Sequence, residues 1–531
     1  MVGRDSLSTS KTKKSSLVSS VGLVSTATAF SRILGLVREQ VMAYFFGAGM
    51  ATDAFITAFR IPNLLRDMFA EGALSSAFIP VFKEKMVNQS DEEAFSLART
   101  VVTAILVVVG GIVLLGIIAT PAIIFLSAKG FAADPAKFEL TVSLTRLMFV
   151  YLLLVSLSAM VMGMLNSFGR FGIPAVSPAM FNLGMILSVL GLHSYFDIPV
   201  YALAVGVLVG GVGQLAIQLP QLWRIGFRFR PQFNLLDESF KRVVRLFGPM
   251  IAGMSAGRVN ILLNTLLASF LMEGSISYLS YSYRLMHFPL GVFAVALGTV
   301  ALPNASEAVA RGDMKELGRT FHRAFGLNMF LVLPSAVFLW LLGRDLVDLI
   351  YQWGAFSETD AANTARALTH YSYGLIGFAA VRVTVPFFYA LKDSMLPMKI
   401  SIVSVVVNML LYFPLIKLWD FAGLAAATSI AGILNFSLLL YYLPSRRIPV
   451  RYGLLFLSVT RIGVAAVFAV LAAELVPINL VSHQSEVAGR VIALGAKLGM
   501  AAFFYLLLCF VFRVEEFRLV WGRLLNRGTG R

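Results

Sequence analysis

The sequence predicts an all-α protein that crosses a membrane many times. Of its 531 residues, 58% are hydrophobic and only 14% are charged, whereas a soluble domain carries about 25% charged residues. Apolar runs of roughly 20 residues, the length of a membrane-spanning helix, recur along the whole chain. Only helices and closed barrels can span lipid. Because the runs are continuous rather than alternating, helices are expected.

The apolar runs predict fourteen membrane helices, separated by short basic or turn-like segments. The expected spans are 20–46, 51–84, 95–127, 138–168, 173–195, 199–225, 240–271, 275–305, 317–342, 360–391, 395–417, 420–444, 453–476 and 487–513. Several of these runs contain proline or glycine, which membrane helices tolerate better than soluble ones do.

The distribution of charge predicts the orientation of the chain. The net charge of +16 comes from 44 basic and 28 acidic residues, and the basic residues gather in alternate loops. Basic loops stay in the cytoplasm, so both termini are expected there, and nucleic acid is not an expected partner. The cytoplasmic tails are 1–19, expected to be disordered, and the basic segment 514–531. The single cysteine, Cys509, excludes an intrachain disulfide.

Motifs that recur at a fixed offset indicate an internal repeat. FAEGALSSAFIP (69–80) is similar to FAVALGTVALP (293–303), and their final prolines lie 223 positions apart. The further pairs at this offset, to within one residue, are Pro174 with Pro397 and Pro220 with Pro444. The repeat predicts two pseudo-symmetric six-helix lobes, 20–225 and 240–444, joined by a linker at 226–239. Parallel repeats of this kind are typical of transporters and predict a central cavity.

Charged residues within the expected spans concentrate in the first two helices of each half. In FSRILGLVREQ (30–40) three charges interrupt an apolar run, although each costs roughly 2.5–3.5 kcal/mol at the bilayer centre. Away from the ends of the spans, these four helices carry Arg32, Arg38, Glu39, Asp53, Arg60, Arg66, Asp67, Glu71, Arg258 and Arg284. Intramembrane charge marks a functional site by default, so these residues predict a charged cavity around the pseudo-axis.

Helical geometry divides the charged part of the first span into two stripes. At about 100° per residue, Ser31, Gly35 and Arg38 share one face, and this face is expected to meet a substrate. Arg32 and Glu39 lie on an adjoining stripe, which is expected to include a gating or structural pair.

The charges of the second span admit a structural interpretation as well. Pro62 is expected to interrupt this helix, because proline removes a backbone hydrogen bond. Arg60, Asp67 and Glu71 would then pair with one another near the cytoplasmic end, where charge is tolerated.

Four further residues have two open interpretations each. Arg258 fits a cavity or a structural pair equally well, and His287 fits a packed or a proton-linked histidine. Arg146 and Arg382 are single charges in their spans and are expected to be structural or interfacial.

An excess of arginine in a membrane cavity predicts an anionic ligand. Arg38, Arg66 and Arg284 have too few acids nearby in the sequence to be explained by pairing. The guanidinium group keeps its proton, and its planar fork matches pairs of phosphate oxygens. The expected cargo therefore carries phosphate, and several arginine forks suit a diphosphate on a lipid.

The sequence offers no chemistry of an enzyme. It contains no GxxxxGK[ST] nucleotide loop, no metal-spaced His/Cys cluster and no nucleophile elbow. No enzymatic activity, cofactor or metal site is therefore expected. Energy would come from an ion gradient, the membrane potential or the gradient of the substrate itself. The centres of the spans 240–271, 395–417 and 420–444 carry no acid, although Asn264 and Asn408 lie there. A sodium site built on carboxylates of the second half is therefore not predicted, and the coupling ion stays open.

Four blocks of the sequence resemble the MurJ/MviN family of lipid II flippases, which belongs to the multidrug/oligosaccharidyl-lipid/polysaccharide exporter superfamily. The blocks are FSRILGLVRE (30–39), FGAGMATDAF (46–55), IPNLLRDMFAEGALSSAFIPVF (61–82) and YRLMHFPLGVFAVALGTVALP (283–303). The resemblance implies a fourteen-helix inner-membrane transporter of peptidoglycan biosynthesis. Its substrate would be undecaprenyl-diphosphate carrying the disaccharide-pentapeptide, flipped from the cytoplasmic to the periplasmic leaflet by alternating access. The last two helices, 453–513, would form a groove for the isoprenoid tail.

The resemblance also assigns roles to single residues. The substrate-binding positions match Ser31, Arg32, Arg38, Arg66 and Arg284, and the gating or ion-pair positions match Glu39 and Asp53. Some members carry acids where this chain has Tyr283 and His287, so the roles of those acids do not transfer. Membrane lipids and peptidoglycan synthases are candidate partners of a monomer.

Two alternatives stay open. An exporter of drugs or of another lipid-linked oligosaccharide would share the fold, although cavity arginines argue against a cationic drug. A non-transporting scaffold that recruits cell-wall synthases would explain the helices but not the buried arginines.

Overall fold

A computed structural model describes residues 5–67, 74–255, 258–475 and 487–528 of the chain. All regular secondary structure in these ranges is helical, so the expected all-α class is confirmed for them. The chain forms two compact units, Met1–Ile276 and Ser277–Arg531.

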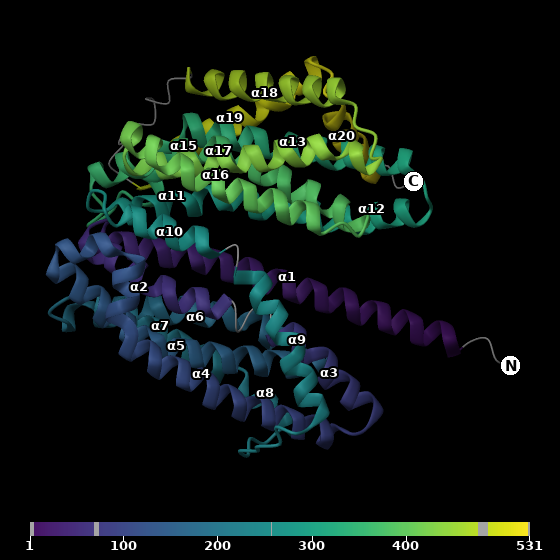
Figure 1. The fold of residues 1–531 in the computed structure, drawn as a ribbon. Coiled ribbons are helices and arrows are strands. Elements are labelled where there is room, and N and C mark those ends of the chain that lie inside the picture. Colours follow the sequence, from purple (N-terminus) through teal and green to yellow (C-terminus); the bar gives the residue numbers. More distant parts are fainter. Residues whose placement is uncertain (1–4, 68–73, 256–257, 476–486, 529–531) are drawn as a thin grey trace. The chain divides into compact units, whose positions relative to one another are not determined.

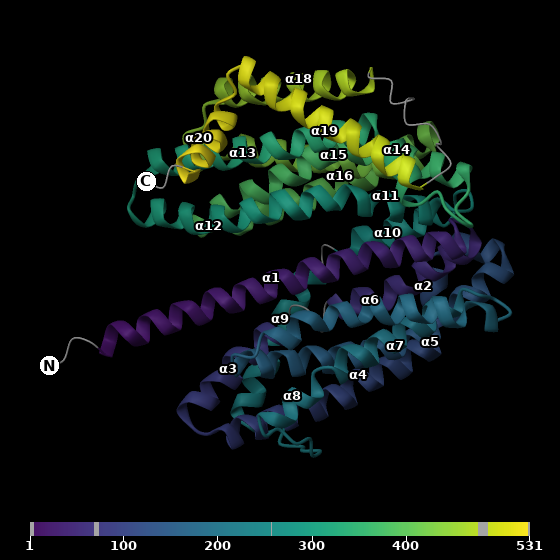
Figure 2. The same ribbon diagram turned by 180° about the vertical axis from the view of Figure 1, so that it is seen from behind.

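The first unit is a bundle of long helices (Figures 1 and 2). Its elements are α1 Asp5–Phe46, α2 Met50–Arg66, α3 Leu74–Asn88, α4 Asp91–Ser127, the 3₁₀ turn η2 Lys129–Ala133, α5 Pro135–Ser167, α6 Gly172–Leu192, the 3₁₀ turn η3 His193–Tyr195, α7 Tyr201–Ala216, α8 Leu219–Arg224, α9 Glu238–Ser255 and α10 Val259–Ala268. Within it α6 packs on α1 and α7, α5 packs on α2 and α4, and α9 packs on α3.

The second unit begins within α11, which starts two residues before the division. The elements from this point are α11 Ser275–Pro289, the π-helical turn η5 Leu290–Ala294, α12 Val295–Ala310, α13 Met314–Leu341, α14 Gly343–Ile350, α15 Glu358–Ala390, α16 Met395–Trp419, α17 Phe421–Tyr442, the 3₁₀ turn η6 Pro444–Arg446, α18 Tyr452–Glu474, α19 Val487–Val511 and α20 Glu515–Gly528. Here α17 packs on α15 and α16, while α13 packs on α15 and α18 (Figure 2).

Eleven helices among the described residues are long and apolar enough to cross a membrane. They coincide with eleven of the expected spans to within five residues at each end. The other three expected spans, 20–46, 51–84 and 240–271, overlap residues whose backbone or side chains the structure does not describe. The count of fourteen and the division into lobes at 226–239 stay predictions.

Two local expectations are wrong. The segment expected to be a disordered tail is helical from Asp5, because no glycine or proline precedes Gly22 after that point and lysine favours helix. Pro62 lies inside α2 instead of ending it, since neighbouring helices can satisfy the backbone groups that a membrane proline leaves free. The basic segment 514–531 also contains a helix, α20.

Arg146 has a structural partner, as the sequence indicates. Its Nε donates a hydrogen bond to the carbonyl of Ile117 on α4, 3.3 Å away. Pro121 lies four residues after Ile117 within the same helix and lacks the N–H group that would otherwise bind this carbonyl. Arg146 therefore satisfies the acceptor that the proline leaves open.

The linker between the expected lobes is fastened to α3. Lys85 Nζ lies 3.1 Å from Asp237 Oδ2, and Asp237 Oδ1 accepts the N–H group of Phe240 at 3.1 Å near the start of α9. Burial would raise the pKa of Asp237, but these hydrogen bonds and the lysine charge outweigh it and lower the pKa. The carboxylate therefore stays ionised and holds α9 beside α3.

Glycines allow α6 and α7 to approach closely. A Cβ atom at Gly184 would lie 2.5 Å from the backbone of Gly210, and one at Gly210 would lie 2.7 Å from the carbonyl oxygen of Phe181. Small residues at such contacts let helix backbones pack together in membranes. This packing fixes the face of α6 that carries Asn182.

Replacing Gly184 with alanine is expected to lower the free energy of unfolding by about 1–3 kcal/mol, because the added methyl group overpacks the α6–α7 contact. Thermal unfolding of the purified protein in detergent measures the change. Gly191→Ala on the same helix is the matched control, since nothing lies within 4 Å of its Cβ position. Equal unfolding midpoints for the two variants would contradict the packing argument.

Candidate functional site

Arg38 is held by α6 and by its neighbour in α1. Its Nη1 donates to Asn182 Oδ1 at 3.1 Å, and its Nη2 forms an ion pair with Glu39. The guanidinium carbon lies 5.7 Å from the centre of the Phe181 ring. Asn182 Nδ2 in turn donates to the carbonyl of Ser31 at 3.1 Å. The stripe of Ser31 and Arg38 therefore packs on α6, where Asn182 links the two residues.

Arg32 lies in a different environment on the same helix. It is exposed, as are Phe30 and Ile33 beside it, which are 52% and 62% exposed. Arg32 makes no ion pair among the described residues, whereas Glu39 pairs with Arg38. The adjoining stripe thus contains no Arg32–Glu39 pair, and Glu39 pairs instead with Arg38, its neighbour in the chain.

Asp53 forms a buried ion pair at the start of α2. Its Oδ2 accepts from Lys137 Nζ at 2.9 Å and from the backbone N–H of Gly274 at 2.9 Å. Asp53 is 1% and Lys137 is 8% exposed. The lysine ammonium also lies 4.3 Å from the centre of the Phe131 ring, a cation–π contact. The pair joins α2, α5 and the segment that follows α10.

That segment is attached to the first unit at two further points. Glu273 Oε1 accepts the N–H group of Met50 at 2.6 Å, and a carboxylate is favourable at this first turn of α2. Ser269 Oγ accepts the N–H group of Gly130 at 3.0 Å. A Cβ at Gly130 would lie 2.2 Å from the carbonyl oxygen of Ser269, so only glycine permits the contact. These hydrogen bonds therefore hold residues 269–274 in place beside Asp53.

The end of α2 carries a second charged group. Asp67, which is 8% exposed, lies 2.9 Å from Arg66 Nη2 and 2.8 Å from Arg258 Nη1. Two arginines thus share one buried carboxylate. Arg60 donates to the hydroxyl of Thr265 on α10. Glu71, the third member of the expected cluster, lies outside the described residues.

The second unit places Arg284 among aromatic and basic side chains. The rings of Tyr283 and His287 lie 4.1 Å apart, and those of Tyr283 and Tyr371 lie 5.5 Å apart. Arg284 and Arg382 both act electrostatically on His287. Arg382 on α15 therefore belongs to the same cluster, which its isolated position in the sequence did not predict.

Arginine side chains recur in the charged groups of both units. A guanidinium group has five N–H donors, and pairing with one carboxylate uses at most two of them. In the first unit Arg66 and Arg258 outnumber the single acid that they share. Guanidinium groups are suited to oxyanions, whose oxygens they bind in pairs.

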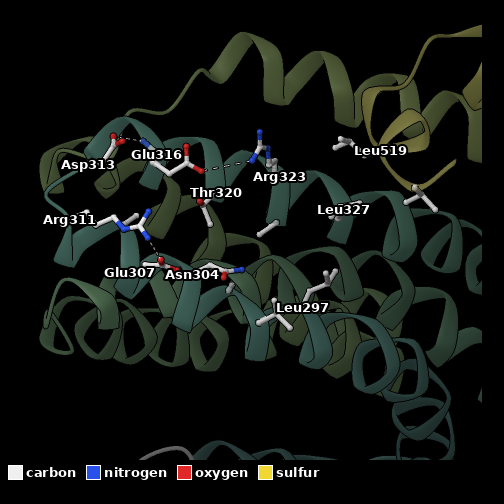
Figure 3. A pocket seen from close by; sticks show the side chains of 15 residues that line it. Leu297, Asn304, Glu307, Arg311, Asp313, Glu316, Thr320, Arg323, Leu327 and Leu519 are labelled. Carbon is white, nitrogen blue, oxygen red and sulfur yellow. Dashed lines mark hydrogen bonds and ion pairs between the residues drawn. The ribbon is translucent and has the colours of Figure 1, made fainter. Parts of the chain in front are cut away.

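A pocket of about 750 Å³ lies between α12, α13 and α20 of the second unit (Figure 3). One end is charged and contains Glu307 with Arg311, and Glu316 with Arg323. The other end is apolar and is lined by residues such as Leu297, Leu327 and Leu519. Its walls come from elements other than 453–513, where the lipid-tail groove was expected, and that groove stays a prediction.

The fold of the chain is that of known membrane transporters. A solved structure titled "Lipid II flippase MurJ, inward closed conformation" superposes with a TM-score of 0.75, covers 92% of this chain and 98% of its own, and is 25% identical. An inward-facing multidrug resistance MATE family transporter shares the fold at a TM-score of 0.65 and 13% identity, over 78% of this chain and 95% of its own. The fold and the charged membrane helices are therefore those of a multi-pass transporter rather than of an enzyme.

Sequence comparison gives the family. The family model described as "Lipid II flippase MurJ" matches residues 42–494. The lipid II flippase MurJ of Burkholderia cenocepacia is 35% identical over 422 residues, which cover 79% of this chain and 82% of that protein. The probable lipid II flippase MurJ of Bdellovibrio bacteriovorus is 32% identical, over 95% of this chain and 97% of its own. The chain belongs to the MurJ family and is a multi-pass protein of the bacterial inner membrane.

Breaking the Asp53–Lys137 pair should destabilise the first unit strongly. Asp53→Asn leaves a buried ammonium group without its counter-ion, which costs about 3–5 kcal/mol. The double variant Asp53→Asn/Lys137→Met should recover part of this loss, because no buried charge then remains. Thermal unfolding in detergent reports both effects.

Glu238→Gln is the control for this experiment, because Glu238 pairs with Lys241 at the surface, where the two side chains are 82% and 42% exposed. An Asp53→Asn variant no less stable than Glu238→Gln would show that the buried pair contributes nothing.

Proposed function

We propose that this chain moves lipid II, the undecaprenyl-diphosphate-linked disaccharide-pentapeptide, from the cytoplasmic to the periplasmic leaflet by alternating access. Membership of the MurJ family supports the substrate. The observation that carries the proposal is the concentration of arginine on α1, α2 and α11, where an apolar or cationic cargo would need none. Arg32 and Arg284 are exposed, and Arg38 and Arg66 are half-buried beside carboxylates. Charge within a membrane span is retained at a cost, and an anionic ligand accounts for this concentration of arginine.

In this proposal the diphosphate binds to Arg32, Arg38, Arg66 and Arg284, with Ser31 beside them. Arg32 is exposed, so its guanidinium group is accessible to a ligand. Arg38 and Arg66 each lie beside a carboxylate with which a phosphate group would compete. Planar forks bind phosphate oxygens in pairs, which a lysine ammonium cannot do.

Glu39 and Asp53 act as ion-pair or gating residues in this proposal. A charged ligand competes with Glu39 for Arg38, since both are oxyanions within reach of one guanidinium. Substrate release would then restore the pair. Asp53 holds the segment after α10 through Gly274, so loss of this hydrogen bond would free that segment during transport.

Orientation and energy follow from the charge distribution. Both termini lie in the cytoplasm, because the basic loops alternate with loops poor in lysine and arginine. The protein works as a monomer without a cofactor, and the membrane potential or a sodium gradient supplies the energy. A potential of 100 mV supplies about 2.3 kcal/mol for each charge that crosses. Peptidoglycan synthases are the proposed protein partners.

Depletion in bacterial cells provides the general test of lipid II transport. Lipid II should accumulate in the inner leaflet as the protein is lost, and a normal rate of appearance in the outer leaflet would reject the proposal in favour of a scaffold.

The arginines can be tested one by one. Arg38→Ala, Arg66→Ala and Arg284→Ala are each expected to abolish complementation of a depletion strain, because the phosphate oxygens lose a bidentate donor. Arg66→Lys and Arg284→Lys should restore only part of the activity, since the charge remains but the fork is lost. Complementation and lipid II exposure at the outer leaflet are measured at matched membrane levels of protein.

Arg38→Ala also removes the ion pair of the buried Glu39, which would lower stability by itself. The double variant Arg38→Ala/Glu39→Gln removes this penalty. It should restore the amount of folded protein but not transport. Recovery of transport in the double variant would make Arg38 a structural residue, and full activity of all three alanine variants would reject the diphosphate clamp.

A further inference from the structure

A second pocket, of about 550 Å³, lies where three distant segments of the second unit meet. It is bounded by the first turns of α13, by the connection between α17 and α18, and by the first turn of α20. Candidate spans begin at Met314 and Tyr452 and end at Val511. The pocket therefore lies at one membrane surface, at the level of the lipid head groups.

The pocket is preformed by tight packing between α13 and the connection before α18. A Cβ at Gly318 would lie 2.6 Å from Pro449 Cγ, so the two backbones touch. The N–H group of Arg451 donates to His322 Nε2 at 3.0 Å. His322 Nδ1 lies 2.7 Å from the carbonyl oxygen of Gly318 and donates to it. Both ring nitrogens are thus used to fix the backbone of Arg451.

The walls carry positive charge that pairing within the protein does not cancel. Lys315, Arg319, Arg323 and Arg451 line the pocket, and all four are exposed. Arg319 and Arg323 lie 2.7 and 3.9 Å from Glu316 and share its carboxylate. Lys315 and Arg451 make no ion pair among the described residues. These two cations are free to bind a phosphate group.

The α20 side of the same pocket is negative. Glu515 is exposed and has no ion-pair partner among the described residues. Glu516 is 8% exposed, and its Oε1 accepts from Ser458 Oγ at 2.8 Å. Its Oε2 has no hydrogen-bond partner within the described part of the chain. An unpartnered carboxylate oxygen behind the wall gives this side of the pocket a negative potential.

A ligand for this pocket must therefore carry both signs of charge and an apolar body. A purely anionic head group would meet repulsion from Glu515 and Glu516. Leu454, Leu455 and Leu519 provide an apolar rim, as the beginning of an acyl chain requires. A membrane supplies such a molecule at high local concentration.

We propose that this pocket binds one phospholipid whose head group carries a phosphate and a primary ammonium, as in phosphatidylethanolamine. The phosphate binds to Lys315 and Arg451, and the ammonium donates to Glu515 in the negative potential of Glu516. The acyl chains extend out of the pocket and pack against Leu454, Leu455 and Leu519. This site is separate from the arginines proposed to bind lipid II, and it fastens α20 and α18 to α13.

The test is native mass spectrometry of the delipidated full-length protein in detergent. The protein is titrated separately with phosphatidylethanolamine, phosphatidylcholine and phosphatidylglycerol of identical acyl chains. One saturable site is expected for phosphatidylethanolamine, with an affinity about tenfold above that for the other two lipids. Phosphatidylcholine lacks an N–H donor, and phosphatidylglycerol lacks the ammonium.

Variants separate the two halves of the site. Lys315→Gln and Arg451→Gln should weaken phosphatidylethanolamine and phosphatidylglycerol alike. Glu515→Gln should weaken phosphatidylethanolamine while leaving phosphatidylglycerol unchanged or tighter. All three side chains are exposed, so folding should persist. Arg447→Gln is the control, because it removes an exposed charge from the same connection outside the pocket.

Three results would overturn the proposal. The first is equal affinity of the unmodified protein for phosphatidylethanolamine and phosphatidylglycerol, which would mark a surface for anionic lipids. The second is an unchanged lipid preference in Glu515→Gln. The third is unchanged binding of phosphatidylethanolamine in both Lys315→Gln and Arg451→Gln.

Discussion

The cost of placing charge among apolar helices constrains the whole of this protein. An ionised side chain that leaves water must gain a partner or a ligand. The structure meets this requirement locally, for example where Lys137 and the backbone of Gly274 share Asp53. It also uses polar groups of neighbouring helices, as where Asn182 links Arg38 to the backbone of Ser31. Transport can draw on these same groups, because they carry charge within the membrane-spanning part of the chain.

The sequence predicts those parts of the fold that depend on length and hydropathy. Eleven of the expected spans appear in place among the described residues, because an unbroken apolar run has one stable form in lipid. The two expectations that are wrong each concern a single local segment. Pro62 continues α2, and the segment after Asp5 joins α1. The first outcome depends on what the neighbouring helices provide, whereas the second follows from a run without glycine or proline.

The sequence indicates which types of residue form the candidate site, but not which residues pair with one another. The concentration of charge in FSRILGLVREQ (30–40) predicts polar contacts on this helix, and Arg38 makes them with Glu39 and Asn182. Helical geometry, however, assigned Arg38 and Glu39 to different stripes, whereas the long arginine side chain reaches its neighbour in the chain. Lys137 and Asn182 were not recognised at all. Each is a single polar residue without periodicity, and its partner lies far away in sequence.

The same physical argument links both proposed lipid sites. In each, fixed basic groups at a membrane protein's surface or interior select a phosphate-bearing lipid, and nearby carboxylates decide which charges the rest of the head group can carry. Binding of lipid II by the purified protein, compared with an analogue that carries the same sugar and lipid on a single phosphate, tests the central claim most directly. The arginine clamp predicts an affinity at least about tenfold lower for the monophosphate, because a bidentate contact is lost. Equal affinities would contradict it.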